Sequence, residues 1–219
     1  MQESAFDKNT VTATPSEIIA QHRLVPVIAL EQGDLAVPLA EALAAGGLPI
    51  AEITFRTAAA EQAIRSMVAQ GGVCVGAGTV LSIDQVDQAR EAGARFIVSP
   101  GFNPGVVRHC LDLGLTVFPG TSTPSDLDMA LDHGLTAVKF FPAEAMGGVA
   151  MLKALAAPYR MMRFIPTGGI GPRNLNDYLS LPSVIACGGS WMVKPQLFVD
   201  GNFTAVEQLT REAVAMAQV

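Results

Sequence analysis

The chain has 219 residues, of which 50% are hydrophobic and 16% are charged, and its formal net charge is −6. The length suggests one large domain or two small ones, and the lack of a linker or composition break favours one. The composition provides for a sizeable core and argues against general disorder. The acidic balance and the lack of a basic run argue against non-specific nucleic-acid binding, although they are compatible with a local site for one small anion.

The N-terminal segment "MQESAFDKNTVTATPS" is polar and carries acidic residues, so it lacks the apolar centre of a signal peptide. No uninterrupted apolar stretch of the sequence approaches the length of a membrane span. We therefore expect a cytoplasmic protein without membrane contact. We also expect residues 1–14 to form a mobile arm and residues 15–219 to form a single domain.

The cysteines and histidines do not have the spacing of metal ligands. Cys74, Cys110 and Cys187 form no CxxC pair, and Cys74 and Cys187 lie in apolar segments where a reduced, buried thiol is expected. The three histidines are scattered along the chain. The sequence therefore predicts no zinc site.

The predicted elements begin with a helix over residues 15–24, placed to cap one end of the fold. Eight β-rich runs follow, and their starts lie about 20–26 residues apart, which leaves room for one loop and one helix per unit. The runs are "VPVIAL" at 25, "IAEITF" at 50, "VCVGAGTV" at 73, "FIVSPG" at 96, "TVFPGT" at 116, "AVKFFP" at 137, "RFIPTGG" at 163 and "VIACGGS" at 184.

Helical segments separate the β-rich runs. Residues 34–47 and 82–94 are Ala-rich and end at or beside a glycine, and residues 104–114 and 124–134 begin at a proline and end at a glycine. Eight such units predict an α/β protein with a (β/α)₈ TIM-barrel fold, compact against the usual size of about 250 residues. A doubly wound open sheet is the alternative, but it carries one dominant glycine-rich turn, whereas these glycines are spread over several strand ends.

Most of the predicted strands end in polar or glycine-rich residues. The carboxyl ends of the strands meet at the active site of a (β/α)₈ barrel. One polar strand end is usually a cap or a turn, but six at the same end of a barrel indicate a pocket. They are 52–56, 76–79, 99–101, 120–123, 167–169 and 188–190.

The second predicted strand carries charges on one face. Side chains alternate along a strand, so Glu52, Thr54 and Arg56 share one face, and the apolar side chains between them share the other. The apolar face suits contact with the surrounding helices, which leaves the charged face directed into the barrel or to its mouth. A structural Glu–Arg pair is the alternative, although barrel interiors are normally filled by branched aliphatic side chains.

The sixth predicted strand contains a lysine in an apolar run. Lys139 shares a face with Ala137 and Phe141, and if this face points inward, Glu52 is its candidate neighbour. Desolvation lowers the pKa of a lysine, and a neutral amine is a nucleophile that condenses with a ketone. A nearby carboxylate opposes that shift but can transfer the protons of imine formation. A structural buried salt bridge is the alternative.

The last two predicted strands end in "PTGGIGPRN" and "CGGSW". Glycines allow backbone N–H groups to approach a ligand, and Pro172 suits the first turn of a helix whose N-terminus favours an anion. Phosphate sites in such barrels often lie after these strands, so we predict one here with Ser190 as a further donor; glycines needed only for tight turns are the alternative. Because Arg56 can hold a carboxylate in a bidentate fork, the combined groups indicate imine chemistry on a phosphorylated keto acid.

Seven segments carry a resemblance to a known family: "EITFRT", "VGAGTVL", "FIVSPG", "PGTSTPSD", "VKFFPAE", "FIPTGGI" and "GGSWM". In this order, and without large gaps from about residue 17 onwards, they resemble the 2-keto-3-deoxy-6-phosphogluconate (KDPG) aldolases, which also act on 4-hydroxy-2-oxoglutarate (KHG). "VKFFPAE" together with "PTGGI" and "GGSW" is quite specific, whereas "GAGTV" alone is not.

The resemblance implies a class I aldolase with a (β/α)₈ fold, usually a homotrimer, that needs no metal or organic cofactor because a protonated imine is the electron sink. It makes Lys139 the Schiff-base lysine and Glu52 the proton-shuttling acid/base. The other implied site residues are Arg56 and Thr79 for the carboxylate of pyruvate, Pro100, Phe141 and Thr167 around the imine, and Gly168, Gly169 and Ser190 for the substrate phosphate.

Other functions remain open on the sequence. A 2-keto-3-deoxy-6-phosphogalactonate aldolase would share the lysine and the glutamate, but this chain follows the gluconate pattern around "FPAE" and "TGGI". A phosphate-binding barrel isomerase or epimerase would use Lys139 electrostatically and form no covalent adduct with pyruvate. A non-catalytic sensor would bind a phosphorylated sugar acid without turnover. An aldolase with KHG as its main substrate would keep the imine chemistry and differ only in the aldehyde product.

Overall fold

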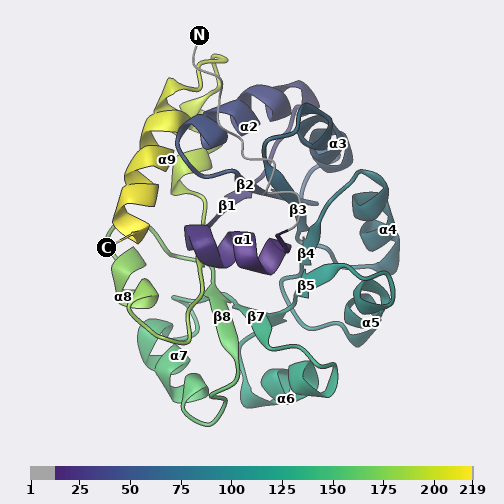
Figure 1. Cartoon of the computed structure of the whole chain (residues 1–219), viewed down its shortest axis with the longest axis vertical. Helices are drawn as coiled ribbons and strands as arrows, with labels where there is room; N and C mark the ends of the chain where they lie inside the picture. Colours follow the sequence, from purple (N-terminus) through teal and green to yellow (C-terminus); the bar gives the residue numbers. More distant parts are fainter. Residues whose placement is uncertain (1–12, 219) are drawn as a thin grey trace.

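The structure is a computed structural model that describes residues 13–218. The mobile arm predicted for residues 1–14 therefore lies, apart from Ala13 and Thr14, outside the described residues. Strands and helices alternate along the chain, and the strands lie at the centre with helices around them (Figure 1). This order confirms the α/β class and the repeating strand–helix units.

Each predicted β-rich run contains a strand, and the fifth contains two short ones. The strands are β1 (Leu24–Ile28), β2 (Ile50–Thr54), β3 (Cys74–Gly78), β4 (Phe96–Val98), β5 (Thr116–Phe118), β6 (Gly120–Thr121), β7 (Ala137–Phe140), β8 (Arg163–Pro166) and β9 (Cys187–Gly189).

The helices are α1 (Pro15–His22), α2 (Ala36–Ala45), α3 (Ala60–Gln70), α4 (Ile83–Glu91), α5 (Pro104–Asp112), α6 (Pro124–Asp132), α7 (Gly148–Ala156), α8 (Leu175–Leu179) and α9 (Thr204–Ala217). Short 3₁₀ helices are η2 (Gly33–Leu35), η3 (Trp191–Val193) and η4 (Pro195–Leu197). Local signals explain the bounds well, because α5 and α6 each begin at a proline behind an Asn103 or Thr123 cap whose side chain accepts backbone N–H groups.

All strand pairs are parallel, but the strands are divided between two sheets. One sheet has six strands in the order β5-β4-β3-β2-β1-β9, and the other has three in the order β6-β7-β8. Pro119 separates β5 from β6, and a proline lacks the N–H that would continue a ladder. On the other side only isolated bridges, Phe164 with Val184 and Thr167 with Gly188, connect the β8 and β9 segments. The structure thus shows a parallel α/β arrangement in two sheets, and no continuous ladder joins β5 to β6 or β8 to β9.

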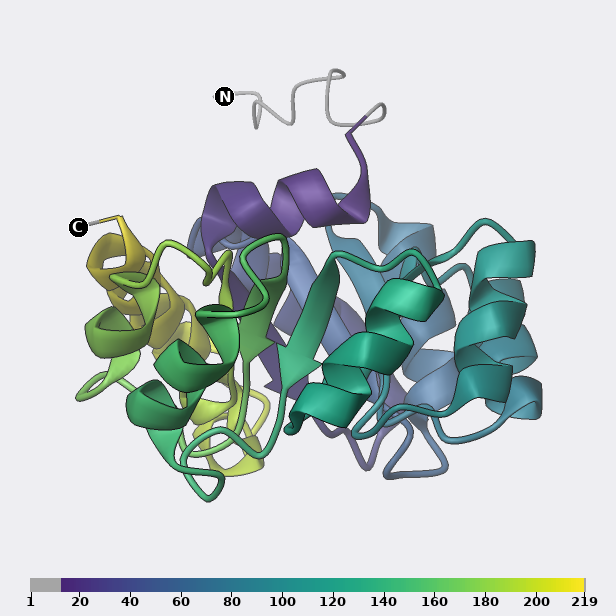
Figure 2. The ribbon, with the colours of Figure 1, turned by 90° about the horizontal axis from the view of Figure 1, so that it is seen from below.

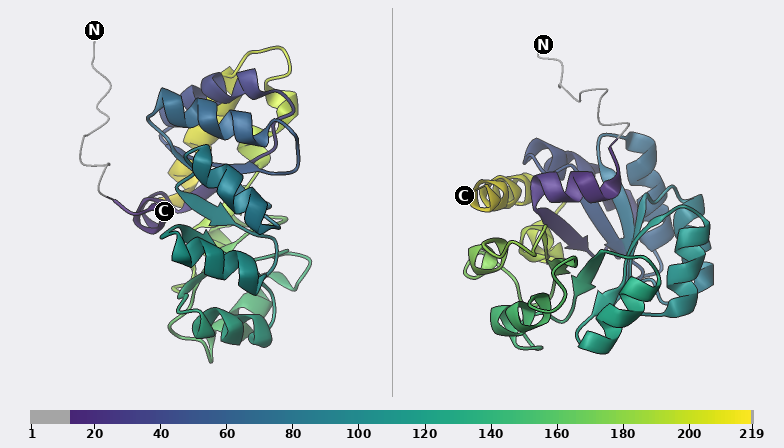
Figure 3. Two further views of the ribbon diagram at one scale, coloured as in Figure 1. Left: turned by 90° about the vertical axis from the view of Figure 1, so that its right-hand side faces the viewer. Right: turned by 60° about the horizontal axis from the view of Figure 1, so that its bottom comes forward.

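The helix α1 lies across one end of the strands. It covers the centre in Figure 1, and in Figure 2 the strand arrowheads of β7 and β8 point away from it. Figure 3 shows α1 outside the layer of helices that follow one another around the strands. Because β1 begins directly after α1, this helix caps the amino ends of the strands and leaves their carboxyl ends free of it.

Several contacts hold α1 in place. Thr14 and Glu17 form a capping box at its start, and Ile18 and Ile19 are buried in the core. At its end Arg23 donates hydrogen bonds to the carbonyl oxygens of Ala217, at 3.1 Å, and of Leu179, at 2.5 Å. Both carbonyls lie at the carboxyl ends of helices, where backbone acceptors lack intrahelical partners.

Candidate active site

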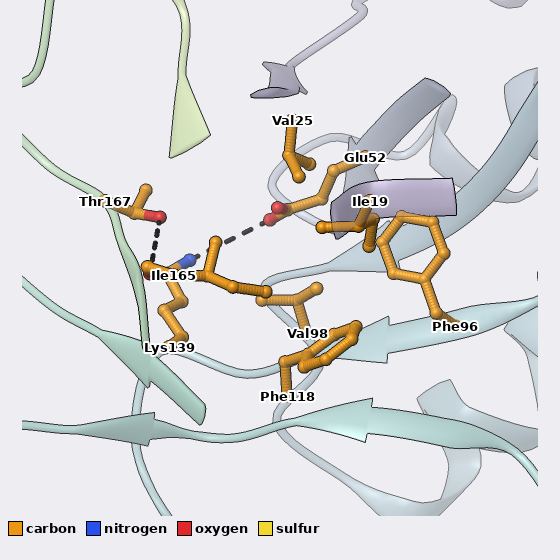
Figure 4. Close-up of a pocket in the computed structure, with 9 residues that line it drawn as sticks. All are labelled: Ile19, Val25, Glu52, Phe96, Val98, Phe118, Lys139, Ile165 and Thr167. Atoms are coloured by element: carbon orange, nitrogen blue, oxygen red, sulfur yellow. Dashed lines mark hydrogen bonds and ion pairs between the residues drawn. The ribbon is translucent and has the colours of Figure 1, made fainter. Parts of the chain in front are cut away.

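Lys139 and Glu52 face one another from β7 and β2 (Figure 4). The Lys139 Nζ lies 3.8 Å from the Glu52 Oε1, and the two side chains are 7% and 3% exposed. At this distance the two groups interact through their charges rather than through a direct hydrogen bond. The Glu52 Oε1 has no hydrogen-bond partner among the described residues, so the carboxylate keeps an acceptor for another group.

An apolar wall surrounds this pair. The same internal cavity is lined by Thr167 and by the hydrophobic side chains Ile19, Val25, Phe96, Val98, Phe118 and Ile165 (Figure 4). Burial raises the pKa of Glu52, and the positive charges of Lys139 and Arg56 oppose that rise. The exclusion of water from the site therefore favours the protonated form of the Glu52 carboxyl group.

A glycine gives the Glu52 carboxylate its space. Gly78 ends β3 and pairs with Thr54 of β2 in the parallel ladder. A Cβ atom at residue 78 would lie 2.2 Å from the Glu52 Oε1 and 2.7 Å from its Cγ. The sequence marked 76–79 as a polar strand end but gave no specific role to Gly78, because only the packing across the strands reveals its contact with Glu52.

The predicted carboxylate-binding residues lie at the carboxyl ends of β2 and β3. The Arg56 Nε donates a 3.0 Å hydrogen bond to the Thr54 Oγ1, which in turn donates to the carbonyl oxygen of Ile28 at 2.7 Å. Arg56 is exposed, so the terminal nitrogens of its guanidinium group are accessible. Thr79 has a φ of 56°, a left-handed conformation that is uncommon for a threonine.

The aromatic ring of Phe141 lies close to the amine. Its centroid is 4.9 Å from the Lys139 Nζ. Pro100, after β4, packs against β6 so closely that a Cβ at Gly120 would lie 2.0 Å from the Pro100 carbonyl oxygen. Thr167 follows β8, and its Oγ1 is 3.4 Å from the carbonyl oxygen of Ile165. These predicted residues therefore lie around Lys139 or at the same strand ends.

An open cleft, distinct from the cavity of the Lys139–Glu52 pair, contains two of the three predicted phosphate residues. Gly169 and Ser190 line it with Ile170, Gly171, Pro172, Arg173, Asn174, Glu144, Trp191 and Lys194. Gly168 and Gly169 have φ values of 102° and 78°, which only glycine adopts without strain. Among residues 13–218, the backbone N–H groups of Gly169 and Ile170 have no intramolecular partner, so both can serve a ligand.

Two segments fix the glycine turn. The N–H groups of Ala143 and Glu144 donate to the carbonyl oxygens of Thr167 and Gly168 at 2.8 Å and 3.1 Å. The Glu144 side chain packs over Gly169, where a Cβ would lie 2.5 Å from its Cγ, and its Oε1 accepts a hydrogen bond from the Tyr178 hydroxyl group. The "FPAE" motif pointed to this segment, but its contact with the glycine turn could not be predicted from spacing.

One prediction about this cleft is wrong. The sequence suggested that Pro172 begins a helix whose N-terminus would attract the phosphate, but α8 begins only at Leu175 and is five residues long. The intervening turn is held instead by Asn174, whose Oδ1 accepts from the Gly171 N–H at 2.9 Å and whose Nδ2 donates to the Gly169 carbonyl oxygen at 3.1 Å. These side-chain bonds compete with an earlier helix start.

Residues 13–218 contain neither a cluster of potential metal ligands nor a membrane-spanning helix. This part of the chain contains no group of three or more His, Cys, Asp or Glu side chains placed to hold a metal ion. None of its helices has both the length and the apolar character required to cross a bilayer.

A buried amine beside a carboxylate, in an apolar cavity of a parallel α/β fold, is suited to chemistry on a carbonyl compound. The KDPG and KHG aldolase family profile matches residues 16–209. The 2-dehydro-3-deoxy-phosphogluconate aldolase of Treponema pallidum is 48% identical over 204 residues, which cover 93% of this chain and 97% of that protein. This chain belongs to the KDPG and KHG aldolase family.

Solved structures of the family have the same fold. The KDPG aldolase of Zymomonas mobilis ZM4, solved with 3-phosphoglycerate, has a TM-score of 0.86 and 41% identity, covering 91% of this chain and 94% of its own. The KDPG aldolase of Legionella pneumophila, solved with pyruvate captured at low pH as a covalent carbinolamine intermediate, has a TM-score of 0.88 and 36% identity. That match covers 91% of this chain and 98% of the other.

Proposed function

We propose that this protein is a class I aldolase that cleaves KDPG to pyruvate and glyceraldehyde 3-phosphate and also acts on KHG. The observation that carries the proposal is the Lys139–Glu52 pair, 3.8 Å apart in an apolar cavity enclosed by the strands and α1. The carbinolamine formed by pyruvate in the Legionella pneumophila relative supports covalent chemistry of the same kind.

The proposed reaction begins when the Lys139 Nζ attacks the C2 ketone to give a carbinolamine, which loses water to form a protonated imine. Glu52 accepts the C4 hydroxyl proton while the C3–C4 bond breaks, and the bonding electrons enter the imine to give an enamine. Glyceraldehyde 3-phosphate leaves. The enamine is protonated at C3, and hydrolysis of the new imine releases pyruvate and restores the lysine.

The surrounding residues have binding roles in this proposal. Arg56 and Thr79 hold the carboxylate of the keto acid, and an arginine fork suits that group. Pro100, Phe141 and Thr167 enclose the imine, and Gly168, Gly169 and Ser190 bind the phosphate. The 3-phosphoglycerate in the Zymomonas mobilis relative is consistent with a phosphate subsite in the family.

We further propose that residues 15–219 form one domain whose two parallel sheets together close a (β/α)₈ barrel, since the β8 and β9 segments are bridged and only Pro119 separates β5 from β6. As the resemblance implies, we expect a homotrimer that needs no metal or organic cofactor. The polar N-terminal segment leads us to expect a cytoplasmic protein, and the acidic net charge leads us to expect no nucleic-acid partner.

The first prediction is that borohydride reduction in the presence of pyruvate leaves a stable pyruvyl adduct on Lys139, located by peptide mass spectrometry. An imine is reduced by borohydride to a secondary amine, whereas a salt bridge is not modified. Lys139→Ala should lose the adduct and essentially all cleavage of KDPG. Lys153→Ala, which changes an exposed lysine in α7, is the matched control and should keep both.

A folded protein that forms no adduct in excess pyruvate would exclude the aldolase mechanism and favour the isomerase or sensor alternative. An adduct with cleavage of the galactonate isomer alone would favour the related 2-keto-3-deoxy-6-phosphogalactonate aldolase. KHG cleavage without KDPG cleavage would leave the imine chemistry in place and change the aldehyde product.

A further inference from the structure

We propose that Arg173 and Lys194 form a cationic clamp for the phosphate group of the substrate and thereby set the preference for a phosphorylated aldehyde. The inference rests on the function proposed above and adds two residues to the predicted site. Both side chains line the cleft that contains Gly169 and Ser190.

Among residues 13–218, neither cation has an acidic partner. The ion pairs of the described residues join Glu61 to Arg65, Asp87 to His109, Glu52 to Lys139 and Glu207 to Arg211, so Arg173 and Lys194 take part in none. The acidic side chain of the cleft is Glu144, whose Oε1 accepts the Tyr178 hydroxyl hydrogen bond. The two cations are exposed and available to an anion from solvent.

The rest of the site supplies little positive charge for a phosphate. The chain has a formal net charge of −6, so a doubly charged phosphate ester is repelled by the molecule as a whole. The five-residue helix α8 begins after the glycine turn and is too short to provide a substantial dipole. Backbone N–H groups and the Ser190 hydroxyl can orient the phosphate oxygens, but only Arg173 and Lys194 carry a full positive charge in this cleft.

The backbone positions of both cations are fixed. Arg173 lies between Gly171 and Asn174, which are joined by the 2.9 Å hydrogen bond from the Gly171 N–H to the Asn174 Oδ1. Lys194 lies between η3 and η4, and its carbonyl oxygen accepts from the Leu197 N–H at 2.9 Å. Because these backbones are held by hydrogen bonds and both side chains are exposed, the guanidinium and ammonium groups can reach a phosphate without refolding of a loop.

The second prediction concerns the aldol direction, with pyruvate and either glyceraldehyde 3-phosphate or unphosphorylated glyceraldehyde. Arg173→Gln and Lys194→Gln should each raise the KM for glyceraldehyde 3-phosphate about threefold, and the double variant about tenfold, as expected for solvent-exposed charge pairs. The kcat should not change, nor should the KM for glyceraldehyde. The difference between wild type and double variant should shrink in high salt.

A binding measurement tests the clamp without turnover. Trp191 is the one tryptophan of the chain and lines the same cleft, so its fluorescence can follow a titration with inorganic phosphate. The double variant should bind phosphate about tenfold more weakly than wild type. Arg160→Gln is the matched control, because this exposed arginine lines a different cleft with Lys153 and Arg163, and it should change neither the KM nor the titration.

Equal losses with both aldehydes, an unchanged KM for glyceraldehyde 3-phosphate in the double variant, or an unchanged phosphate titration would each overturn the clamp. Failure of the proposed function has a different signature, namely no pyruvate adduct in wild type. In that case the phosphate titration still decides whether Arg173 and Lys194 bind the anion.

Discussion

At the scale of single residues, the Lys139–Glu52 pair is better explained by chemistry than by stability. Moving two charges out of water costs several kcal/mol per ion, and their mutual attraction rarely exceeds that cost. The separation of 3.8 Å and the unpartnered Glu52 Oε1 show that the geometry is not optimised for attraction. Such a pair is retained where a desolvated amine and a proton acceptor act on a substrate.

The third prediction is that Gly78→Ala lowers the kcat about 100-fold while the protein remains folded, the loss typical of a catalytic group displaced by about 1 Å. The added methyl group would lie 2.2 Å from the Glu52 Oε1, so the carboxylate must move. The backbone of residue 78 has no positive φ, so alanine fits its conformation. Steady-state cleavage of KDPG, with circular dichroism as the folding check, measures the effect.

Gly105→Ala is the control for this prediction. Gly105 is an exposed residue in the first turn of α5, and the contact nearest to an added Cβ is the Asn103 Oδ1 at 3.3 Å. This variant should keep full activity. Full activity of Gly78→Ala would mean that the position of the Glu52 carboxylate is not critical, and it would remove Glu52 as the proton acceptor.

At the scale of elements, α1 connects the stability of the fold with the site. Ile19 projects from α1 into the cavity that also contains Lys139 and Glu52, so the helix closes the apolar wall beneath the pair (Figure 4). The Thr14–Glu17 capping box stabilises the start of this helix, and the Arg23 hydrogen bonds hold its end against α8 and α9.

The fourth prediction is that Ile19→Ala lowers the free energy of unfolding by about 3 kcal/mol, because it removes a fully buried aliphatic side chain and leaves a cavity. Ile19→Val, which removes one methylene group, should cost about 1 kcal/mol. Urea denaturation followed by circular dichroism measures both. A loss below about 0.5 kcal/mol for Ile19→Ala, the usual size of a surface substitution's effect, would show that α1 is not part of the cooperative core.

Local sequence signals predicted where helices and strands occur, but they did not predict where the sheet is interrupted. The helix expected over 124–134 is found as α6 (Pro124–Asp132), since its proline start and glycine end are encoded within a few residues. The run "TVFPGT" was expected to be one strand and is split into β5 and β6, and the β8–β9 contact consists of isolated bridges. The hydrogen bonds between strands join residues that are far apart in the chain. The hydrophobic periodicity of a single segment carries no information about these bonds.

The same limit applies to the site. Lys139 and Glu52 were identifiable because a charge in an apolar run is unusual, and the structure brings them within 3.8 Å. Arg173 and Lys194 give no such signal, because an exposed cation in a polar loop is common. Only the structure shows that both line the same cleft. A site residue can be predicted from the sequence when its residue type is unusual for its local segment. A site residue that is ordinary in its segment can be recognised only when the fold shows which residues lie near it.

At the scale of the whole molecule, the two ends of the strands have different tasks. The carboxyl ends carry Arg56, Thr79 and the glycine turn, and the amino ends are covered by α1. In α/β barrels, chemistry collects at the carboxyl ends and stability at the opposite face. A titratable group at the α1 end should therefore affect the stability of the molecule without affecting its catalysis.

The fifth prediction concerns His22, the last residue of α1, whose pKa is lowered by its partial burial. In the unfolded chain the imidazole titrates near its ordinary pKa of 6.5, which lies above its pKa in the folded protein. Between these two pKa values, unfolding therefore takes up a proton. Above pH 6.5 His22 is neutral in both states and does not lower the free energy of unfolding. As the pH decreases from 6.5 towards the pKa of His22 in the folded protein, the free energy of unfolding falls. Urea denaturation at about pH 7.5 and pH 5.5, on either side of the usual histidine pKa, should show a larger loss in wild type than in His22→Gln, which cannot be protonated. All other titrating groups are common to the two proteins, so equal losses would contradict the prediction, and a kcat that changes in His22→Gln would contradict the separation of the two ends.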